Sequence, residues 1–285
     1  MYELVHAERA IIPAARACRV LQVSRGGYYK WLHAEPSPRS TDDAVLAAEV
    51  KEVFQEHRGR YGAPRIRRAL RRRGPRPSKK RVARLMRTLG LRGHTPRRFR
   101  KTTDSRHTKR IAPNLLKRDF TVPAPNRVLA GDITYIATTE GWLYLAVLLD
   151  LYSRRVVGWA MSDRIDTELA LGALRMAGAT RALEANWIHH TDRDCRYGSD
   201  EYLAALSELG SRPSMSRRGD CWDNAVSESF FATLEKELLA LSPMQSRIKT
   251  RKDVANYIEN YYNLVRLHSH LDYVSPIEFE TNAST

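Results

Sequence analysis

Acidic side chains in the C-terminal half of the sequence are candidates for chemistry. The segment "HTDRDCRYGSDEYL", residues 190–203, carries Asp192, Asp194 and Asp200 directly after a short apolar and aromatic run. A solvated loop that closes a strand would explain these acids. A carboxylate that holds a hard metal ion would explain them equally well, because such ions take oxygen ligands.

Two further acids bear on this choice. Asp132 lies in the middle of the β-rich segment "RVLAGDITYIA". Aspartate is depleted from strands, and a buried carboxylate without a partner is costly, so we expect a metal ion or a cation to offset it. Glu228 lies near the start of a helix, off its apolar row, and on its own it would be an unremarkable surface residue. Between Asp192 and Glu228 there are 35 residues.

An α/β domain is predicted to position these acids. Three apolar segments with short connections, at 127–137, 142–150 and 154–161, predict an antiparallel meander. A helix at about 166–180, a strand at 187–191, a helix at about 199–209 and a strand at 212–216 follow. This alternation predicts parallel pairing, and therefore a mixed five-stranded sheet flanked by helices. Asp192 then lies just past a strand end, where α/β ligand sites gather.

The N-terminal half has the opposite charge balance. Of the formal net charge of +16, residues 1–120 contribute +21 and residues 121–285 contribute −5. Residues 58–118 hold 24 basic side chains and a single acid, Asp104. A helix decorated for solubility usually mixes the two signs, so this segment favours a polyanionic partner, and double-stranded DNA is the expected one.

Two short helices in this basic half predict a unit like a helix-turn-helix. In "GAPRIRRALRRRGPRPSKKRVARLMRTLGLRG", residues 62–93, Gly74-Pro75 ends the first helix and Ser78 caps the second. The alternative is a helical hairpin whose arginines only meet water. The DNA-contact candidates are Arg65, Arg68, Arg72, Lys79, Lys80, Arg81, Arg84, Arg97 and Arg98. We expect a helical DNA-binding region at 1–93, a basic linker at 94–123 and a catalytic core with a C-terminal helical segment at 124–285.

Composition excludes several other classes. No apolar run is long enough for a transmembrane helix, and the N-terminus is a poor signal peptide. The three cysteines are far apart, which fits thiols in a reducing cytoplasm, and no zinc-ligand pattern occurs. We therefore expect a cytoplasmic protein with no membrane partner.

Long motifs across the chain resemble one family. They include "HRGRYGAPRIRRAL", "SKKRVARLMRTLGLRG", "NRVLAGDITYI", "LDLYSRRVVGWAM", "HTDRDCRYGS", "SMSRRGDCWDNAVSESFFATLEKEL" and "YIENYYNLVRLHSHLDYVSPIEF". In these the chain resembles the integrase-core (DDE) transposases of insertion-sequence family three, of the second-reading-frame (OrfB) type. The resemblance implies a ribonuclease-H-like core and an acidic triad at Asp132, Asp192 and Glu228.

The resemblance also implies the reaction. Three carboxylates suit two Mg²⁺ or Mn²⁺ ions about 4 Å apart, one at the attacking oxygen and one at the leaving oxygen. Water first cuts the end of the element, and the exposed 3′-hydroxyl then attacks a second strand. A structure-selective nuclease and a site-specific DNA-binding regulator are the alternatives. The substrates would be terminal inverted repeats and target DNA.

Some positions depart from the family or keep alternatives open. Asp194 stands where the family usually has Gly, and Glu235 stands where it commonly has a Lys that is thought to touch DNA. Asp150 is a rival acid, for which its place in "LDLYSR" favours a structural role, and Asp200 is expected to cap a helix.

The C-terminal motif leaves two roles open. Arg266 and His268, in "YNLVRLHSHLDY", follow a predicted structural helix from Val254 to Tyr262. They support either the active site and DNA or only C-terminal packing. The sequence has no sustained leucine heptad. The family that the chain resembles supplies such a zipper from a first reading frame. The resemblance therefore implies a homo-oligomer on DNA that works with, or fused to, the first-frame (OrfA) protein.

Overall fold

The computed structural model describes residues 1–94, 111–117, 119–217 and 225–283. It divides into two compact units: Met1–Gly59 with Ala69–Arg92, and Arg60–Arg68 with Gly93–Thr285. Among the described residues, no helix is both long and apolar enough to span a membrane.

The first unit is helical. Its elements are α1 (Tyr2–Ala7), a 3₁₀ turn η1 (Glu8–Ala10), α2 (Ala14–Val20), α3 (Arg25–Leu32), α4 (Pro38–Glu56), the second half of α5 (Ala63–Arg73), and α6 (Lys79–Thr88). As predicted, the Ser78 side chain caps α6 by accepting the backbone N–H of Arg81. Val82, Leu85 and Met86 form the buried stripe of that helix.

The second unit is built on a five-stranded mixed sheet, as the strand pattern predicted. The strands are β1 (Val128–Thr138), β2 (Gly141–Asp150), β3 (Val156–Ser162), β4 (Ile188–Thr191) and β5 (Arg212–Met215). Their order is β3-β2-β1-β4-β5, with β1, β2 and β3 antiparallel and β4 and β5 parallel to β1.

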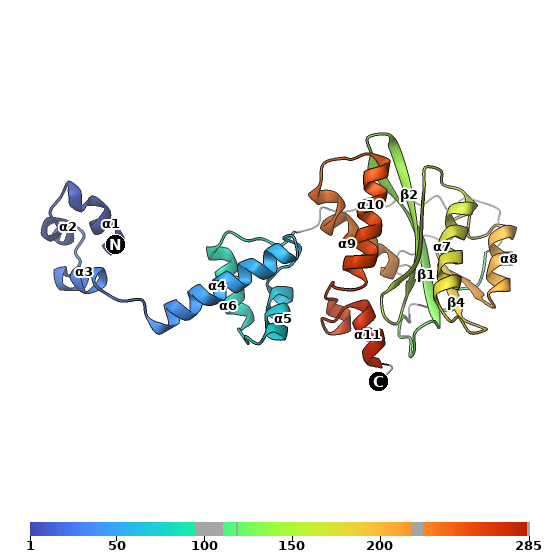
Figure 1. Ribbon diagram of the computed structural model, residues 1–285, viewed down its shortest axis with the longest axis horizontal. Coiled ribbons are helices and arrows are strands. Elements are labelled where there is room, and N and C mark those ends of the chain that lie inside the picture. The colour runs from blue at the N-terminus through green and yellow to red at the C-terminus, as the bar shows by residue number, and fades with distance from the viewer. Residues whose placement is uncertain (95–110, 118, 218–224, 284–285) are drawn as a thin grey trace. The chain divides into compact units, whose positions relative to one another are not determined.

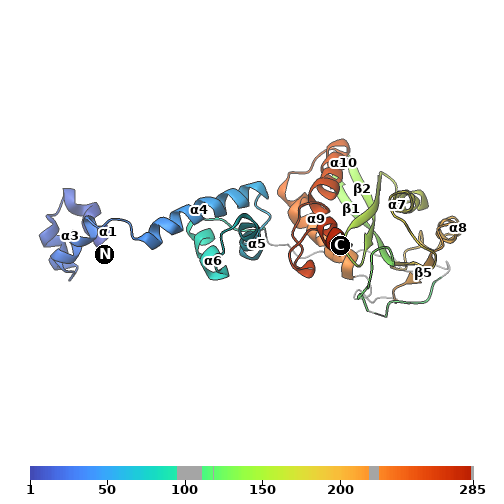
Figure 2. The same cartoon turned by 60° about the horizontal axis from the view of Figure 1, so that its bottom comes forward.

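Helices cover both faces of this sheet (Figures 1 and 2). On one face lie α7 (Thr167–Thr180) and α8 (Asp200–Glu208), and on the other α9 (Ala225–Glu237) and α10 (Arg247–Asn256). Strand β2 shows why: Ala146 and Leu148 pack toward α7, whereas Leu145 and Val147 pack toward α9. The chain then continues through a 3₁₀ turn η3 (Leu239–Leu241), α10, a π-helix η4 (Tyr257–Tyr262), a 3₁₀ turn η5 (Ser269–Leu271) and α11 (Pro276–Ala283).

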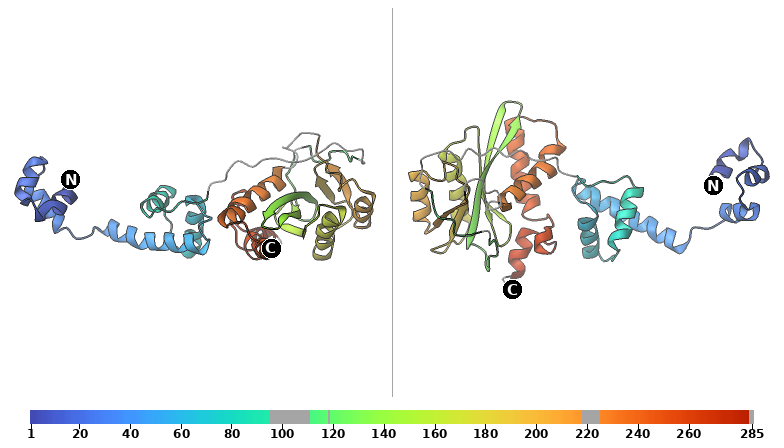
Figure 3. Two further views of the ribbon diagram at one scale, coloured as in Figure 1. Left: turned by 90° about the horizontal axis from the view of Figure 1, so that it is seen from above. Right: turned by 180° about the vertical axis from the view of Figure 1, so that it is seen from behind.

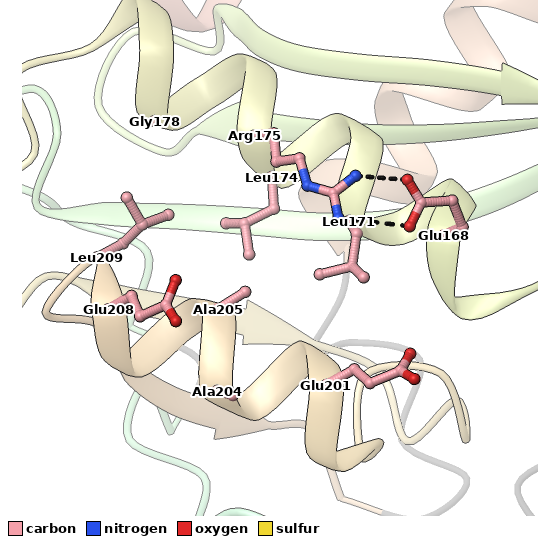
Figure 4. A pocket seen from close by; sticks show the side chains of 10 residues that line it. All are labelled: Glu168, Leu171, Leu174, Arg175, Gly178, Glu201, Ala204, Ala205, Glu208 and Leu209. Carbon is pink, nitrogen blue, oxygen red and sulfur yellow. Dashed lines mark hydrogen bonds and ion pairs between the residues drawn. The ribbon is translucent and has the colours of Figure 1, made fainter.

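The views from above and behind show α7 and α8 side by side on their face (Figure 3). A shallow groove of about 570 Å³ runs between these two helices. Leucines from both helices line it, and Arg175 of α7 pairs with Glu168 along its rim (Figure 4).

Two predicted details differ from the structure. The cap of α8 is Ser199, whose side chain accepts the N–H of Tyr202, and not Asp200, which lies in the first turn. The predicted Val254–Tyr262 helix is the end of α10 followed by the π-helix, in which Tyr257, Ile258 and Tyr262 are buried.

Candidate active site

Asp132 and Asp192 are brought together by strand pairing. Strands β1 and β4 are parallel neighbours, with Gly131 opposite Thr191. Asp132 follows Gly131 in β1, and Asp192 follows Thr191 at the end of β4. Both aspartates therefore lie at the same end of the paired segment. The Asp132 carboxylate accepts the backbone N–H of Ile133 at 2.8 Å, and the Asp192 carboxylate accepts that of Asp194 at 3.0 Å.

The charge environment of Asp132 is acidic. Burial raises the pKa of Asp132 well above its ordinary value, and the charges of Asp192, Glu228 and Asp194 raise it further. Glu228 lies in the first turn of α9, which packs on β1 and β2. Asp192 and Glu228 are thus both within electrostatic reach of Asp132, and all three acids belong to the second unit.

The donors suit a hard divalent cation, although no closed cage is formed. In the described part of the chain, no three His, Cys, Asp or Glu side chains are already grouped so that they could hold a metal ion. A cluster of carboxylate oxygens whose mutual repulsion raises a pKa is nevertheless the environment that a divalent cation neutralises. By donor type and by charge, the residues fit magnesium or manganese.

Two neighbouring features are structural. The Asp194 carboxylate pairs with Arg196 and accepts its backbone N–H, so this departure from the family pattern has a local partner. His189, on β4, is buried. Burial lowers the pKa of His189 to about 3, and the charge of His190 contributes to this shift. Its Nε2 meets the hydroxyl of Tyr202 at 2.8 Å, which is a core contact.

Family models match both units. A model described as an integrase core domain matches residues 122–221, and a second of the same description matches residues 209–276. A model of an HTH-like domain matches residues 40–99.

Full-length relatives decide the family. The chain is 41% identical over 286 residues to transposase InsF for insertion sequence IS3A of Escherichia coli strain K12, covering 98% of each chain. It is 40% identical to the transposase for insertion sequence element IS904 of Lactococcus lactis, covering 87% of this chain and 98% of that one. It is 42% identical to a 31 kDa protein of insertion element IS600 of Shigella sonnei, covering 92% and 96%. The chain belongs to the integrase-core transposases of insertion-sequence family three.

Solved structures with a similar core are more distant. One is an intasome of simian T-cell lymphotropic virus, at 17% identity and a TM-score of 0.48, covering 75% of this chain and 70% of that chain. Another is the HTLV-2 integrase catalytic core domain in complex with magnesium, at 14% identity and a TM-score of 0.44, covering 55% and 98%.

Asp150 of the transposase occupies a structural position. Its side chain is fully buried at the end of β2, and its carboxylate accepts the backbone N–H groups of Asn126 and Tyr152 at 2.7 and 2.8 Å. Arg181 approaches the same carboxylate at 3.3 Å. These partners account for the acid without a role in the reaction.

A second buried carboxylate on α9, Glu237, escaped the sequence reading. It accepts N–H groups of Arg266 at 2.8 to 3.0 Å and the hydroxyl of Tyr257 at 3.0 Å. Burial raises the pKa of Glu237, but the charges of Arg266 and Arg65 outweigh burial and hold that pKa below its ordinary value. The available signal was its spacing, because Glu237 follows Phe230 by two helical turns and faces the core.

Arg266 and His268 meet in this cluster. The Arg266 guanidinium is buried against Glu237, and its Nη1 lies 3.0 Å from Nε2 of His268. Burial, followed by the charge of Arg266, lowers the pKa of His268 to about 2, so its imidazole is neutral. Packing is therefore one role of the C-terminal motif.

The DNA-contact candidates differ in their surroundings. Arg65 donates to the carbonyl of Leu267 at 2.9 Å, and Arg68 pairs with Asp272 at 2.7 Å, both inside the second unit. Arg81 and Arg84 share Asp43 at 2.6 and 2.5 Å in the first unit. Exposed positions are Arg72, Lys79 and Lys80. Arg97 and Arg98 lie outside the described residues.

Proposed function

We propose that the chain cuts DNA at the ends of an insertion sequence and joins them to a new strand, using Asp132, Asp192 and Glu228 as its catalytic carboxylates. The observation that carries this proposal is the parallel register of β1 and β4, which sets Asp132 beside Asp192, with Glu228 in electrostatic reach. Membership of the transposase family supports it.

The carboxylates would hold two Mg²⁺ or Mn²⁺ ions. When bound, such ions lower the pKa of an attacking water and stabilise the developing charge on the leaving oxygen. The protein itself would contribute by positioning the three carboxylates. Strand β1 and the end of β4 fix two carboxylates on the rigid sheet, and α9 carries the third, so the scissile phosphodiester is held in line with its attacker.

The reaction needs no covalent enzyme intermediate. In the first step, water attacks the phosphorus at the end of the element, and the bond to the 3′-oxygen breaks, leaving a 3′-hydroxyl. In the second step, this hydroxyl loses its proton and attacks a phosphodiester of another strand, whose own 3′-oxygen leaves. Each step replaces one phosphorus–oxygen bond by another and consumes no oxidant or high-energy phosphate.

The basic half would hold duplex DNA. We propose residues 1–93 as the DNA-binding region, 94–123 as a basic linker, and 124–285 as the core with its helical extension. The HTH-like match and the exposed Arg72, Lys79 and Lys80 support this division of labour. Terminal inverted repeats and target DNA would be the substrates.

Pairing two DNA ends requires at least two protomers. We propose a homo-oligomer on DNA that works with the first-frame protein or as a fusion to it, since the sequence offers no leucine heptad of its own. The relatives named above come from bacteria, so the site of action would be nucleoid DNA in the cytoplasm.

The decisive experiment compares Asp132→Asn, Asp192→Asn and Glu228→Gln with the wild type on DNA that carries the ends of the element. In magnesium, each variant should lose cleavage and strand joining by at least about a thousandfold, because the three groups act as a unit. DNA affinity measured in calcium should stay within about twofold. Asp200→Asn, in the exposed first turn of α8, is the matched control and should react normally.

Full cleavage by any one of the three variants would remove that residue from the triad. Hydrolysed but never joined products from the wild type would instead indicate a nuclease.

A further inference from the structure

A cavity with a basic wall lies beside the start of α9, within the second unit. Its volume is about 300 Å³, which is the small end of the range for ligand pockets. One wall is a face of α9 that includes Ser229 and Thr233. The rest is formed by Tyr262 and Ser269 together with Arg65, Arg154, Arg266, His268 and His270.

The charge on this wall is only partly neutralised. Glu237 pairs with Arg266 at 2.8 Å and with Arg65 at 3.5 Å, so one carboxylate serves two guanidinium groups. Glu237 does not line the cavity, and the described lining residues include no Asp or Glu. The third arginine, Arg154, forms no ion pair with any described residue. The cavity therefore favours an anion.

The surroundings of Arg154 pre-orient its guanidinium. Its backbone has φ of 61°, and its N–H donates to the carbonyl of Asp150 at 2.8 Å, which fixes the turn between β2 and β3. Its Nη2 lies 2.9 Å from Nε2 of His270. Since arginine only donates, this imidazole nitrogen accepts, and the remaining guanidinium N–H groups can donate to a ligand.

The same arrangement recurs at Arg266, whose Nη1 donates to Nε2 of His268. Neither imidazole adds a negative charge, so each contact orients a guanidinium group without neutralising it. Arg266 has its counter-charge in Glu237, whereas Arg154 forms no ion pair with a described residue. Ser229 and Thr233 add two hydroxyl groups to the opposite wall. Guanidinium and hydroxyl donors around a small cavity are the groups that bind phosphate oxygens.

The position of the cavity points to a source for that phosphate. Val226 and Ser229, which line the cavity, flank Glu228 in the first turn of α9. One helical turn rises 5.4 Å, and a DNA strand carries one phosphate for about every 3.4 Å of its axis. The side chains of Val226 and Ser229 point to another side of this turn than Glu228. A strand whose reacting phosphate lies at Glu228 would therefore pass around the start of α9 to present a neighbouring phosphate to the cavity.

We propose that this cavity binds a backbone phosphate next to the one that is cut, with Arg154 as its main donor. This proposal rests on the proposed function for the identity of the strand. A volume of about 300 Å³ leaves room for the phosphate together with part of its sugar. Arg154 would thus be a positioning residue that fixes the register of the strand.

The test measures the affinity of the full chain for element-end DNA, without cleavage, over a range of salt concentrations. Arg154→Gln should bind about tenfold more weakly, and its log–log salt slope should be smaller by about 0.9, the value of one lost phosphate contact. Arg175→Gln is the matched control, because Arg175 pairs with Glu168 on the opposite face of the sheet (Figure 4). This variant should keep both values.

A second arm identifies the contact. Single neutral methylphosphonates are placed at each backbone position near the cut site. At one position the methylphosphonate should cost the wild type about tenfold in affinity and Arg154→Gln almost nothing more, because the two changes remove the same contact. Arg154→Lys keeps the charge, so it should retain the salt slope. Arg154→Ala, which also removes the charge, replaces Arg154→Gln if that variant does not fold.

Two results would overturn the proposal. One is a set of methylphosphonates whose costs are fully additive with the Arg154 variant at every position. The other is stabilisation of the wild type by inorganic phosphate that depends on Arg154, together with that additivity, which would assign the cavity to a free anion. Cleavage by the triad variants would refute the proposed function but would not affect this binding result.

Discussion

The two ends of helix α9 carry carboxylates in opposite surroundings. Glu228, in the first turn, lies within electrostatic reach of Asp132, whose pKa is raised by burial and by Asp192. Glu237, in the last turn, lies among arginines, and its pKa is lowered although its side chain is fully buried. Carboxylates lie close to one another at the first turn of α9, whereas arginines neutralise the carboxylate of the last turn.

The difference separates two uses of a buried acid. Burial alone raises a carboxyl pKa, so burial cannot distinguish a catalytic acid from a structural one. The sign of the neighbouring charge can. Acids that raise the pKa of one another are stabilised when a metal ion binds between them, whereas an acid that pairs with arginines already has its counter-charge.

The largest effect is expected at the neutralised end. Glu237→Gln leaves the buried Arg266 without its counter-charge, so the free energy of unfolding should fall by about 3–5 kcal/mol. Urea denaturation of the full chain measures this. Glu235→Gln, at an exposed position of the same helix, is the control and should stay within about 0.5 kcal/mol. Equal effects of the two variants would contradict a special role for the Glu237 pairing.

The pH dependence of the stability that Glu237 contributes follows from the direction of its pKa shift. The pKa of Glu237 in the folded state lies below its ordinary value of 4.5, because Arg266 and Arg65 outweigh burial. Its stabilisation is therefore complete above pH 4.5 and is lost as the pH falls through the folded pKa. The stability gap between wild type and Glu237→Gln should be constant from pH 8 to about 5 and should shrink at lower pH. A gap unchanged at pH 3 would refute this assignment.

At the acidic end, removing charge should stabilise the fold. Asp132→Asn keeps an oxygen for the N–H of Ile133 but relieves the repulsion with Asp192. With a chelator present, the free energy of unfolding should rise by about 1 kcal/mol, or roughly 2–4 °C in melting temperature. Added magnesium should raise the melting temperature of the wild type more than that of the variant. A variant that melts below the wild type in chelator would show that the acids do not repel.

Sequence reasoning reached the acidic end of α9 more easily than the neutralised end. An aspartate inside an apolar strand and an acid just past a later strand are local signals for Asp132 and Asp192. Glu228 was singled out through the resemblance to the family, because on its own it is unremarkable. The partners of Glu237 are remote: Arg60, whose Nε donates to the Glu237 carbonyl at 2.8 Å, is 177 residues away. No local pattern predicts such a contact.

The arginines of the basic segment also have partners that are remote in the sequence. Arg65 and Arg68 lie in a run with no nearby acids, which favoured DNA as their partner, yet Glu237 and Asp272 lie beside them in the fold. Tyr61 shows the same packing, since its hydroxyl accepts the backbone N–H of Leu267 at 2.9 Å. Local charge balance therefore indicates a polyanionic partner for the basic half as a whole, but it does not identify the residues in contact. The DNA contacts of Arg72, Lys79 and Lys80 stay predictions.

The smallest effect is expected between the two ends of α9, at Glu235, where the family commonly has Lys. Glu235 lies with Tyr135 and Leu238 in the wall of a small pocket, and partial desolvation there raises its pKa. Glu235→Lys removes an anion and adds a cation on the helix that carries Glu228. DNA affinity should rise by about threefold, with a salt slope steeper by about 0.9 if the new cation meets one phosphate. Glu201→Lys on α8 makes the same charge change on the opposite face of the sheet and serves as the control. If the two variants gain equally, net charge alone attracts the DNA, and α9 has no particular contact at this position.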